Sequence, residues 1–166
     1  RVNATLASIV SIDEAHNMRK RHRGVWLYIV NEDNQILMLK RPDDVVICPS
    51  TWYAPGEHTK YLESYADTAF RGLLEEMRLR AHQILMLKPL FTTPSLVEIE
   101  FEEVLSTGSG ILQQKHDAQW TQSFLVRVLK STVHKRNREA VAMEWVPLQL
   151  LEQWANNKTE ESFCQV

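Results

Sequence analysis

Two short runs near the start of the chain are rich in apolar, β-branched and aromatic residues, as paired strands are. Residues 24–30 form the first run and residues 35–40 form the second. Between them, residues 31–34 (Asn-Glu-Asp-Asn) are a cluster of turn-forming residues. The pattern therefore predicts a β-hairpin that is made of these two strands.

A helix is expected on either side of the strand-rich part of the chain. Ser11 is followed three residues later by Glu14, which is the spacing of a capping box. We therefore expect a short helix from about Ser11 to Arg21. Near the other end, Pro147 suits the first position of a closing helix that reaches about Asn156.

The strongest helical signal lies in the middle of the chain. Ser64 and Asp67 have a capping spacing, and the helix that they begin extends to about Arg78. Its apolar residues recur at steps of three and four, which places them on one face. They are Ala66, Ala69, Phe70, Leu73, Leu74 and Met77.

Further strands complete the predicted fold. Ser106–Gly110 is a turn-forming cluster, and we place His116 and Asp117 in a surface loop that follows it, with a contact to substrate as the alternative. Strands on both sides of a central helix, with another helix at the end, predict an α+β fold in which helices sandwich a mixed sheet. The additional strands are expected at residues 84–87, 95–105, 119–129 and 142–146.

Composition narrows the class of protein but does not indicate a function. The chain has 166 residues and a formal net charge of −2, so neither nucleic acid nor a membrane is required as a partner. Two cysteines exclude a dense disulfide framework and a four-cysteine zinc site. No apolar run is long enough to span a membrane, and no targeting segment is present in these residues. We expect a soluble protein and leave its compartment open.

Acidic residues gather between the central loop and the central helix. Glu63 lies in the loop, and Arg71, Glu75 and Glu76 lie on the helix. Arg71 and Glu75 are one turn apart and can pair. Adjacent carboxylates are suitable oxygen ligands for Mg²⁺ or Mn²⁺, which complete their shells with water and substrate phosphates. A solvated helix face whose acids pair with arginine is the alternative.

The spacing of these residues resembles the Nudix box. That family pattern has a glycine, a glutamate six residues later, and a helix with Arg-Glu, an aliphatic residue and Glu-Glu before a final glycine. Six positions match without insertion or deletion: Glu63, Arg71, Leu73, Glu75, Glu76 and Leu79. Three positions depart, because Glu57 replaces the first glycine, Gly72 replaces the helix glutamate and Arg78 replaces the last glycine.

Flanking segments extend the resemblance over most of the chain. They imply one Nudix-like domain over residues 1–166, with its core at about 14–155 and an α/β/α sandwich around a mixed sheet. Within the family, the chain most resembles the branch that contains isopentenyl-diphosphate isomerases and their hydrolase relatives. The residues that carry this resemblance are His16, His22 and His58. Isomerases of that branch have a cysteine directly before a Gly-His pair, which this chain lacks, so isomerase chemistry is disfavoured.

The resemblance also implies roles for individual residues. Glu75, Glu76 and Glu57 are expected to bind Mg²⁺ or Mn²⁺, and Glu76, Glu75, Arg71 and Glu139 are expected to be catalytic. Substrate binding is assigned to Glu63, Arg41, Trp52 and His58. Gly72 removes a carboxylate from the metal site, which weakens this expectation.

Two functions follow from this pattern. The first is metal-dependent hydrolysis of a small molecule in which a nucleoside diphosphate is linked to another group, with an altered metal shell and low activity. The second is an inactive Nudix module that binds a nucleotide, RNA or a protein partner within a larger assembly. The basic residues 19–23 are the candidate contact for RNA, with a solvated helix end as the alternative.

Overall fold

The structure is a computed structural model that describes residues 10–45, 47–104, 112–134 and 140–157. Its strands are β1 (His22–Val30), β2 (Gln35–Lys40), β3 (Trp52–Tyr53), β4 (Gly56–His58), β5 (Ile84–Pro89), β6 (Ser95–Val104), β7 (Leu112–Val128) and β8 (Ala142–Pro147). Its helices are α1 (Ile12–Asn17), α2 (Tyr65–Met77) and α3 (Leu148–Asn157), with short 3-10 turns η1 (Ala81–Gln83) and η2 (Lys130–Thr132).

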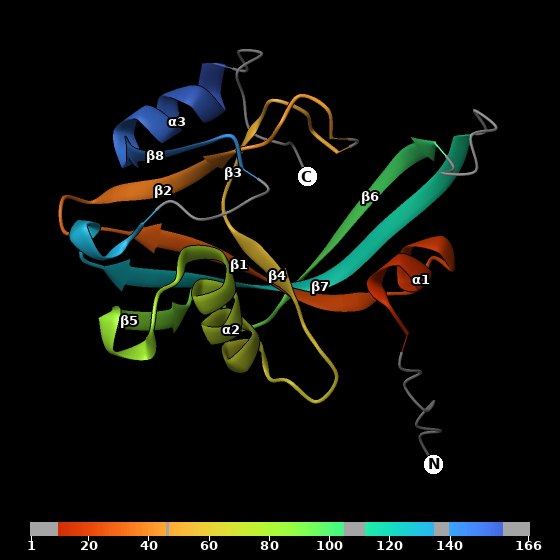
Figure 1. The fold of residues 1–166 in the computed structure, drawn as a ribbon, viewed down its shortest axis with the longest axis horizontal. Coiled ribbons are helices and arrows are strands. Elements are labelled where there is room, and N and C mark those ends of the chain that lie inside the picture. The colour runs from red at the N-terminus through yellow and green to blue at the C-terminus, as the bar shows by residue number, and fades with distance from the viewer. Residues whose placement is uncertain (1–9, 46, 105–111, 135–139, 158–166) are drawn as a thin grey trace.

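All of these strands belong to one mixed sheet. Its central order is β3-β2-β1-β7-β5, while β4 pairs with β1, β6 with β7 and β8 with β2. Strands β1 and β7 run parallel, with His22 opposite Gln119, and the other pairs are antiparallel. The long strand β7 projects from the main sheet together with its partner β6, and α1 lies beside β7 (Figure 1).

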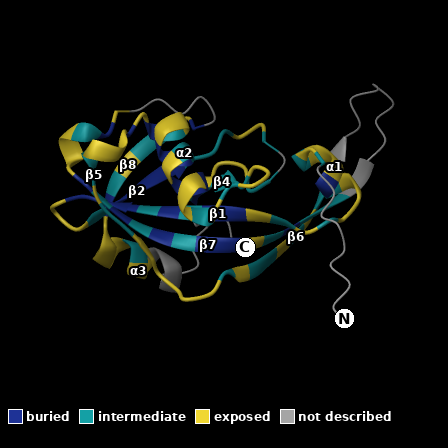
Figure 2. Cartoon of the chain, turned by 90° about the horizontal axis from the view of Figure 1, so that it is seen from below, coloured by how far each residue is buried: buried dark blue, intermediate teal, exposed yellow. Residues whose placement is uncertain are grey.

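Helices cover both faces of the sheet. Alternate residues of β1 point to opposite faces, so Leu27 packs in one core cluster with Leu73 of α2 and Val30 packs in the other. Leu151 of α3 lies against the second cluster. Figure 2 shows α2 and α3 on opposite sides of the buried centres of β1 and β7. The expected α+β sandwich with a mixed sheet is confirmed.

Most elements lie where the sequence places them, but some boundaries differ. The hairpin of β1 and β2 and the helix α2 are confirmed. Helix α1 ends at Asn17 rather than near Arg21, because Arg19 adopts a left-handed backbone with a φ of 53° and the chain turns into β1. The placement of His116 and Asp117 in a surface loop is wrong, since both lie within β7.

Within the described residues, no helix is long and apolar enough to cross a membrane.

Candidate functional site

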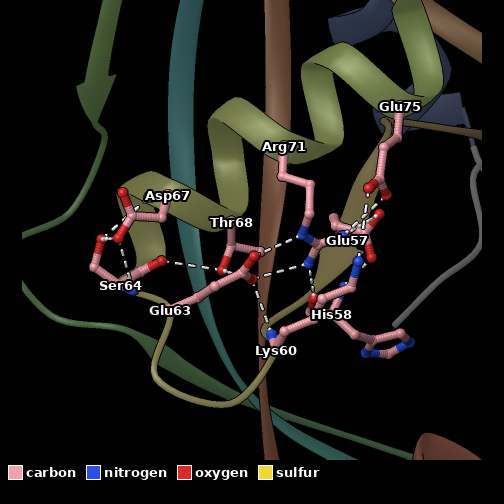
Figure 3. Close-up of polar contacts among 9 residues, drawn as sticks. All are labelled: Glu57, His58, Lys60, Glu63, Ser64, Asp67, Thr68, Arg71 and Glu75. Carbon is pink, nitrogen blue, oxygen red and sulfur yellow. Dashed lines mark hydrogen bonds and ion pairs between the residues drawn. The ribbon is translucent and has the colours of Figure 1, made fainter.

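The start of helix α2 is fixed by a complete capping box. The hydroxyl of Ser64 accepts a hydrogen bond from the backbone N–H of Asp67 at 3.1 Å. In return, the Asp67 carboxylate accepts one from the backbone N–H of Ser64 at 3.1 Å. Both N–H groups lie at the helix start, where the helix itself offers them no acceptor. The box holds the loop before α2 against the helix (Figure 3).

Arg71 is the centre of the carboxylate group. Its Nε and Nη2 atoms donate to the two oxygens of Glu63 at 2.8 and 3.0 Å, which is a bidentate arrangement. Its Nη1 atom donates to Oε2 of Glu75 at 3.1 Å and lies 3.1 Å from Oε2 of Glu57. Nη2 also donates to the backbone carbonyl of His58. The predicted pairing of Arg71 with Glu75 is therefore present, but two more carboxylates share the same cation (Figure 3).

The hydrogen bonds between Arg71 and Glu63 favour the ionised form of both side chains. Hydrogen bonds from Arg71 are the main cause that lowers the pKa of Glu63 from 4.5 to about 2, and Lys60 N–H and Thr68 hydroxyl also donate to it. The same hydrogen bonds raise the pKa of Arg71. Glu63 is thus an ionised structural partner of Arg71.

Glu57 reaches this centre from a different element. It lies on β4, which pairs with β1 so that Glu57 is opposite Val25. Its Oε2 faces Arg71, and its Oε1 accepts the backbone N–H of His58 at 2.8 Å. The side chain is 18% exposed, compared with 48% for Glu75. Glu57 is therefore a mostly buried carboxylate that is fixed by Arg71 and by the backbone of His58, whereas Glu75 lies at the surface.

A second polar cluster lies beside the first. It consists of three histidines from α1, β1 and β4 and an aspartate from β7: His16, His22, His58 and Asp117. One nitrogen of each histidine lies within 4.8 Å of the corresponding nitrogens of the other two. Asp117 Oδ1 lies 3.3 Å from His22 Nε2 and 3.6 Å from His16 Nε2. Of the described residues, these histidines are the group of three or more potential ligands that comes together closely enough to hold a metal ion.

Several polar atoms of this second cluster are buried and lack hydrogen bonds. His16 Nε2, His58 Nδ1 and Asp117 Oδ1 each have no hydrogen-bond partner in the structure. Burial, followed by the nearby His22, lowers the pKa of His58 from 6.5 to about 4, and burial is also the main cause that lowers the pKa of His22. Neutral imidazole is the form that binds metal ions. Three imidazoles and a carboxylate suit a first-row transition metal such as Zn²⁺.

One cavity of about 540 Å³ joins the two clusters. Glu76 of α2 and Glu57 of β4 line it, together with His16, His58 and Asp117 of the second cluster. The rest of the wall is mostly apolar and contains Arg41, whose guanidinium lies 4.5 Å from the centre of the Tyr53 ring. Such a cavity can hold an anionic group between a metal site and an arginine.

The cavity brings together only some of the residues predicted for the site. Arg41, Glu57, His58 and Glu76 line it. Glu63, Arg71 and Glu75 form the charged network behind it, and Trp52 is buried in the second core cluster. Tyr53, the residue after Trp52, lines the cavity instead. Glu139 lies outside the described residues.

His16, His22 and Asp117 are additional residues of this site that the sequence pattern does not assign to it. The histidines were a usable signal, since they were part of the resemblance to one branch of the family. Asp117 lacked such a signal, because its approach to His22 depends on the parallel register of β1 and β7. Sequence spacing alone does not reveal which strands pair in parallel.

The basic residues 19–23 are partly engaged in contacts within the chain. Arg23 lies 4.1 Å from the centre of the Tyr65 ring and donates to the backbone carbonyl of Glu63 at 3.3 Å. Arg21 lies 3.5 Å from Glu98. These contacts attach the segment to the loop before α2 and to β6, and the charge of Glu98 offsets part of the charge of Arg21.

Comparisons with known proteins agree with this arrangement. The family model of the NUDIX domain matches residues 20–165, so the chain belongs to the Nudix family. No curated protein matches the chain significantly.

Among solved structures, the chain resembles DR0079 from Deinococcus radiodurans, with a TM-score of 0.61 and 16% identity over 93% of this chain and 85% of that one. It also resembles the dihydroneopterin triphosphate pyrophosphohydrolase of E. coli, with a TM-score of 0.52 and 20% identity over 85% and 94% of the two chains. A MutT protein from Methanosarcina mazei Go1 matches with a TM-score of 0.52 and 18% identity over 80% and 81%. At these identities, the likeness concerns the fold.

Proposed function

We propose that this chain is a metal-dependent hydrolase that cleaves the diphosphate linkage of a compound in which a nucleoside diphosphate is joined to another group. The observation that carries the proposal is the shared cavity, which is lined by Glu76 of the Nudix helix, by Glu57 of β4 and by imidazoles of the mostly buried histidine cluster. Membership of the Nudix family supports the reaction class. Fold alone does not determine the substrate, so the side chains of the site have to indicate the substrate class.

His16, His22, His58 and Asp117 would hold the resident ion. Their buried atoms without hydrogen bonds fit this role, because burying such groups is costly unless a ligand satisfies them. The ion would supply positive charge that neutralises phosphate oxygens in the cavity. The Asp117 carboxylate would offset part of the charge of the ion and orient the two imidazoles that it faces.

Glu57 and Glu76 would act on the substrate side of the cavity. Mg²⁺ or Mn²⁺ that accompanies a diphosphate needs only one or two protein carboxylates, and both side chains line the wall. A carboxylate there can also accept the proton of the attacking water. Arg71 holds Glu57 and Glu75 in place through one nitrogen, so we assign it an orienting role.

Arg41 and its surroundings would bind the remainder of the substrate. Arg41 lines the cavity, and the positive charge and planar donors of its guanidinium suit a phosphate oxygen. Tyr53 and the neighbouring Pro42 and Ile47 provide an apolar wall. This combination favours a ligand with an anionic centre and a flat or apolar group.

A panel of candidate substrates tests the proposal. Nucleotide sugars, NADH, ADP-ribose and dinucleoside polyphosphates would be incubated with the protein and Mg²⁺, Mn²⁺ or Zn²⁺, and products would be followed by mass spectrometry. We expect cleavage of at least one compound, and a loss of about 100-fold or more in Glu76→Gln. The matched control is Glu144→Gln on the exposed surface of β8, which should retain activity.

Failure of every substrate with every metal would contradict the proposed hydrolase. Binding of the same compounds without cleavage would then favour the inactive nucleotide-binding module.

A further inference from the structure

Gly72 lies in the interior of helix α2 at a point where there is no room for a side chain. A Cβ atom added to Gly72 would lie 2.9 Å from the Cβ of Glu57, 3.4 Å from its Cγ and 3.4 Å from Cδ1 of Leu27. The shortest of these contacts is closer than real Cβ atoms approach one another. Glycine is a poor helix former, so helix propensity does not explain it at this position.

The atom nearest to this position is the Cβ of Glu57, and a change of rotamer does not move it away. The Cβ of Glu57 is fixed by the backbone of β4, and Glu57 is held opposite Val25 of β1 by the sheet. Any larger residue at position 72 must therefore displace the strand or the helix. Leu27 Cδ1, by contrast, is the end of a flexible side chain and could give way.

The side chain of Glu57 crosses helix α2 at Gly72 and continues to two partners. Its Oε2 lies 3.1 Å from Arg71 Nη1, and its Oε1 accepts the backbone N–H of His58. Glu57 also lines the cavity together with Glu76. The absence of a side chain at Gly72 thus leaves room for the side chain of Glu57, whose residue lines the cavity.

We infer that Glu57 and Gly72 form one functional unit, in which β4 supplies the carboxylate that the Nudix pattern places at position 72 of the helix. In that pattern, position 57 is glycine and position 72 is glutamate. Here the two residue types are exchanged, and the close packing of Glu57 against Gly72 makes a side chain at position 57 compatible only with glycine at position 72. Gly72 is a positioning residue, and Glu57 is the residue that faces the bound ion and phosphate. This last role rests on the proposed function.

A double-mutant cycle on thermal stability tests the packing. Gly72→Ala should lower the unfolding temperature by roughly 3 °C or more, because a methyl group is forced against Glu57. In a Glu57→Gly background the same change should leave the unfolding temperature unchanged or raise it, since the space is then open and alanine favours the helix. Equal effects in both backgrounds would overturn the inference. If Gly72→Ala alone fails to fold while the double variant folds, the inference is supported.

Binding of Mn²⁺ tests the role of the carboxylate. The protein would first be loaded with Zn²⁺, which imidazole-rich sites favour, and free Mn²⁺ would then be followed by electron paramagnetic resonance. Glu57→Gln should weaken Mn²⁺ binding by about tenfold or more. The exchanged variant Glu57→Gly/Gly72→Glu should bind within about threefold of the natural chain. Its matched control, Glu57→Gly/Gly72→Ala, lacks the carboxylate and should bind as weakly as Glu57→Gln.

The two readouts separate this inference from the proposed hydrolase. Neither one requires a substrate, so both remain decisive if no compound in the panel is cleaved. Coupled stabilities without recovery of Mn²⁺ binding in the exchanged variant would reduce Gly72 and Glu57 to a packing pair and overturn their assignment to ion binding.

Discussion

Asp117 Oδ1 lies 3.3 Å from His22 Nε2, and neither atom forms a hydrogen bond. The two residues are brought together by the parallel pairing of β1 with β7, in which His22 lies opposite Gln119. Buried polar atoms without hydrogen bonds are costly to keep, and a ligand that binds both atoms would remove this cost. One nitrogen each of His16 and His58 lies within 4.8 Å of a nitrogen of His22, so the three imidazoles could hold a metal ion beside Asp117.

Metal content is the first measurable consequence. We expect the purified protein to bind about one Zn²⁺ or another first-row transition metal, measured by elemental analysis and by calorimetry after chelation. His58→Ala should lower the affinity by about 100-fold, and Asp117→Asn by about tenfold or more, since each removes a ligand or its partner. His82→Ala is the control, because His82 is exposed on η1 and lies outside the cluster.

The same ion should also stabilise the fold. An ion at a concentration of 100 times its dissociation constant adds about 2.7 kcal/mol to the free energy of unfolding. We expect a higher unfolding temperature with Zn²⁺ for the natural chain and for His82→Ala, and a much smaller rise for His58→Ala. An equal rise in all three proteins would show that zinc acts somewhere else.

The Nudix helix was predictable because its signals are local. Ser64 and Asp67 cap it, and Arg71 and Glu75 pair within it, so each contact depends on residues a few positions apart. The same holds for the hairpin of β1 and β2. Local spacing is directly visible in a sequence, and the structure confirms these elements.

The histidine cluster was not predictable in the same way, because it depends on distant segments. The turn-forming cluster Ser106–Gly110 and the polar residues 113–116 favour a loop at Asp117 in the sequence. In the structure, β7 begins at Leu112, and its pairing with β6 extends that strand. Pairing with a neighbouring strand, rather than the composition of the segment, determined its conformation.

The packing of α2 gives a direct comparison between two adjacent leucines. Leu73 is fully buried against β1 and belongs to the first core cluster, whereas Leu74 is 46% exposed. We expect Leu73→Ala to lower the free energy of unfolding by about 2–5 kcal/mol, and Leu74→Ala by about 1 kcal/mol or less. Chemical denaturation followed by circular dichroism measures both. Similar losses in the two variants would place α2 in a different orientation on the sheet.

Arg41 should contribute to the binding of phosphate rather than to stability. Its guanidinium lies 4.5 Å from the centre of the Tyr53 ring, and both residues line the cavity. We expect Arg41→Ala to weaken the binding of inorganic diphosphate by about tenfold or more, measured by calorimetry in the presence of Mg²⁺. Arg41→Lys should recover only part of the loss, because lysine lacks the planar fork. Arg80→Ala, at an exposed position, should bind diphosphate normally, and a similar loss in that variant would indicate nonspecific attraction.

The network around Arg71 predicts how stability depends on pH. The pKa of Glu63 is lowered from 4.5 to about 2 in the folded protein, mainly by hydrogen bonds from Arg71. Its stabilising contribution is therefore fully present above about pH 4.5 and is lost as the pH falls toward 2.

At neutral pH, Glu63→Gln should lower the free energy of unfolding by about 2 kcal/mol, because it leaves Arg71 with one ionic partner fewer. The difference between the two proteins should shrink steadily below pH 4.5. Glu100→Gln, on the exposed side of β6, should follow the natural chain at every pH. A difference between Glu63→Gln and the natural chain that stays constant down to pH 2 would mean that Glu63 stabilises the loop through its shape and not through its charge.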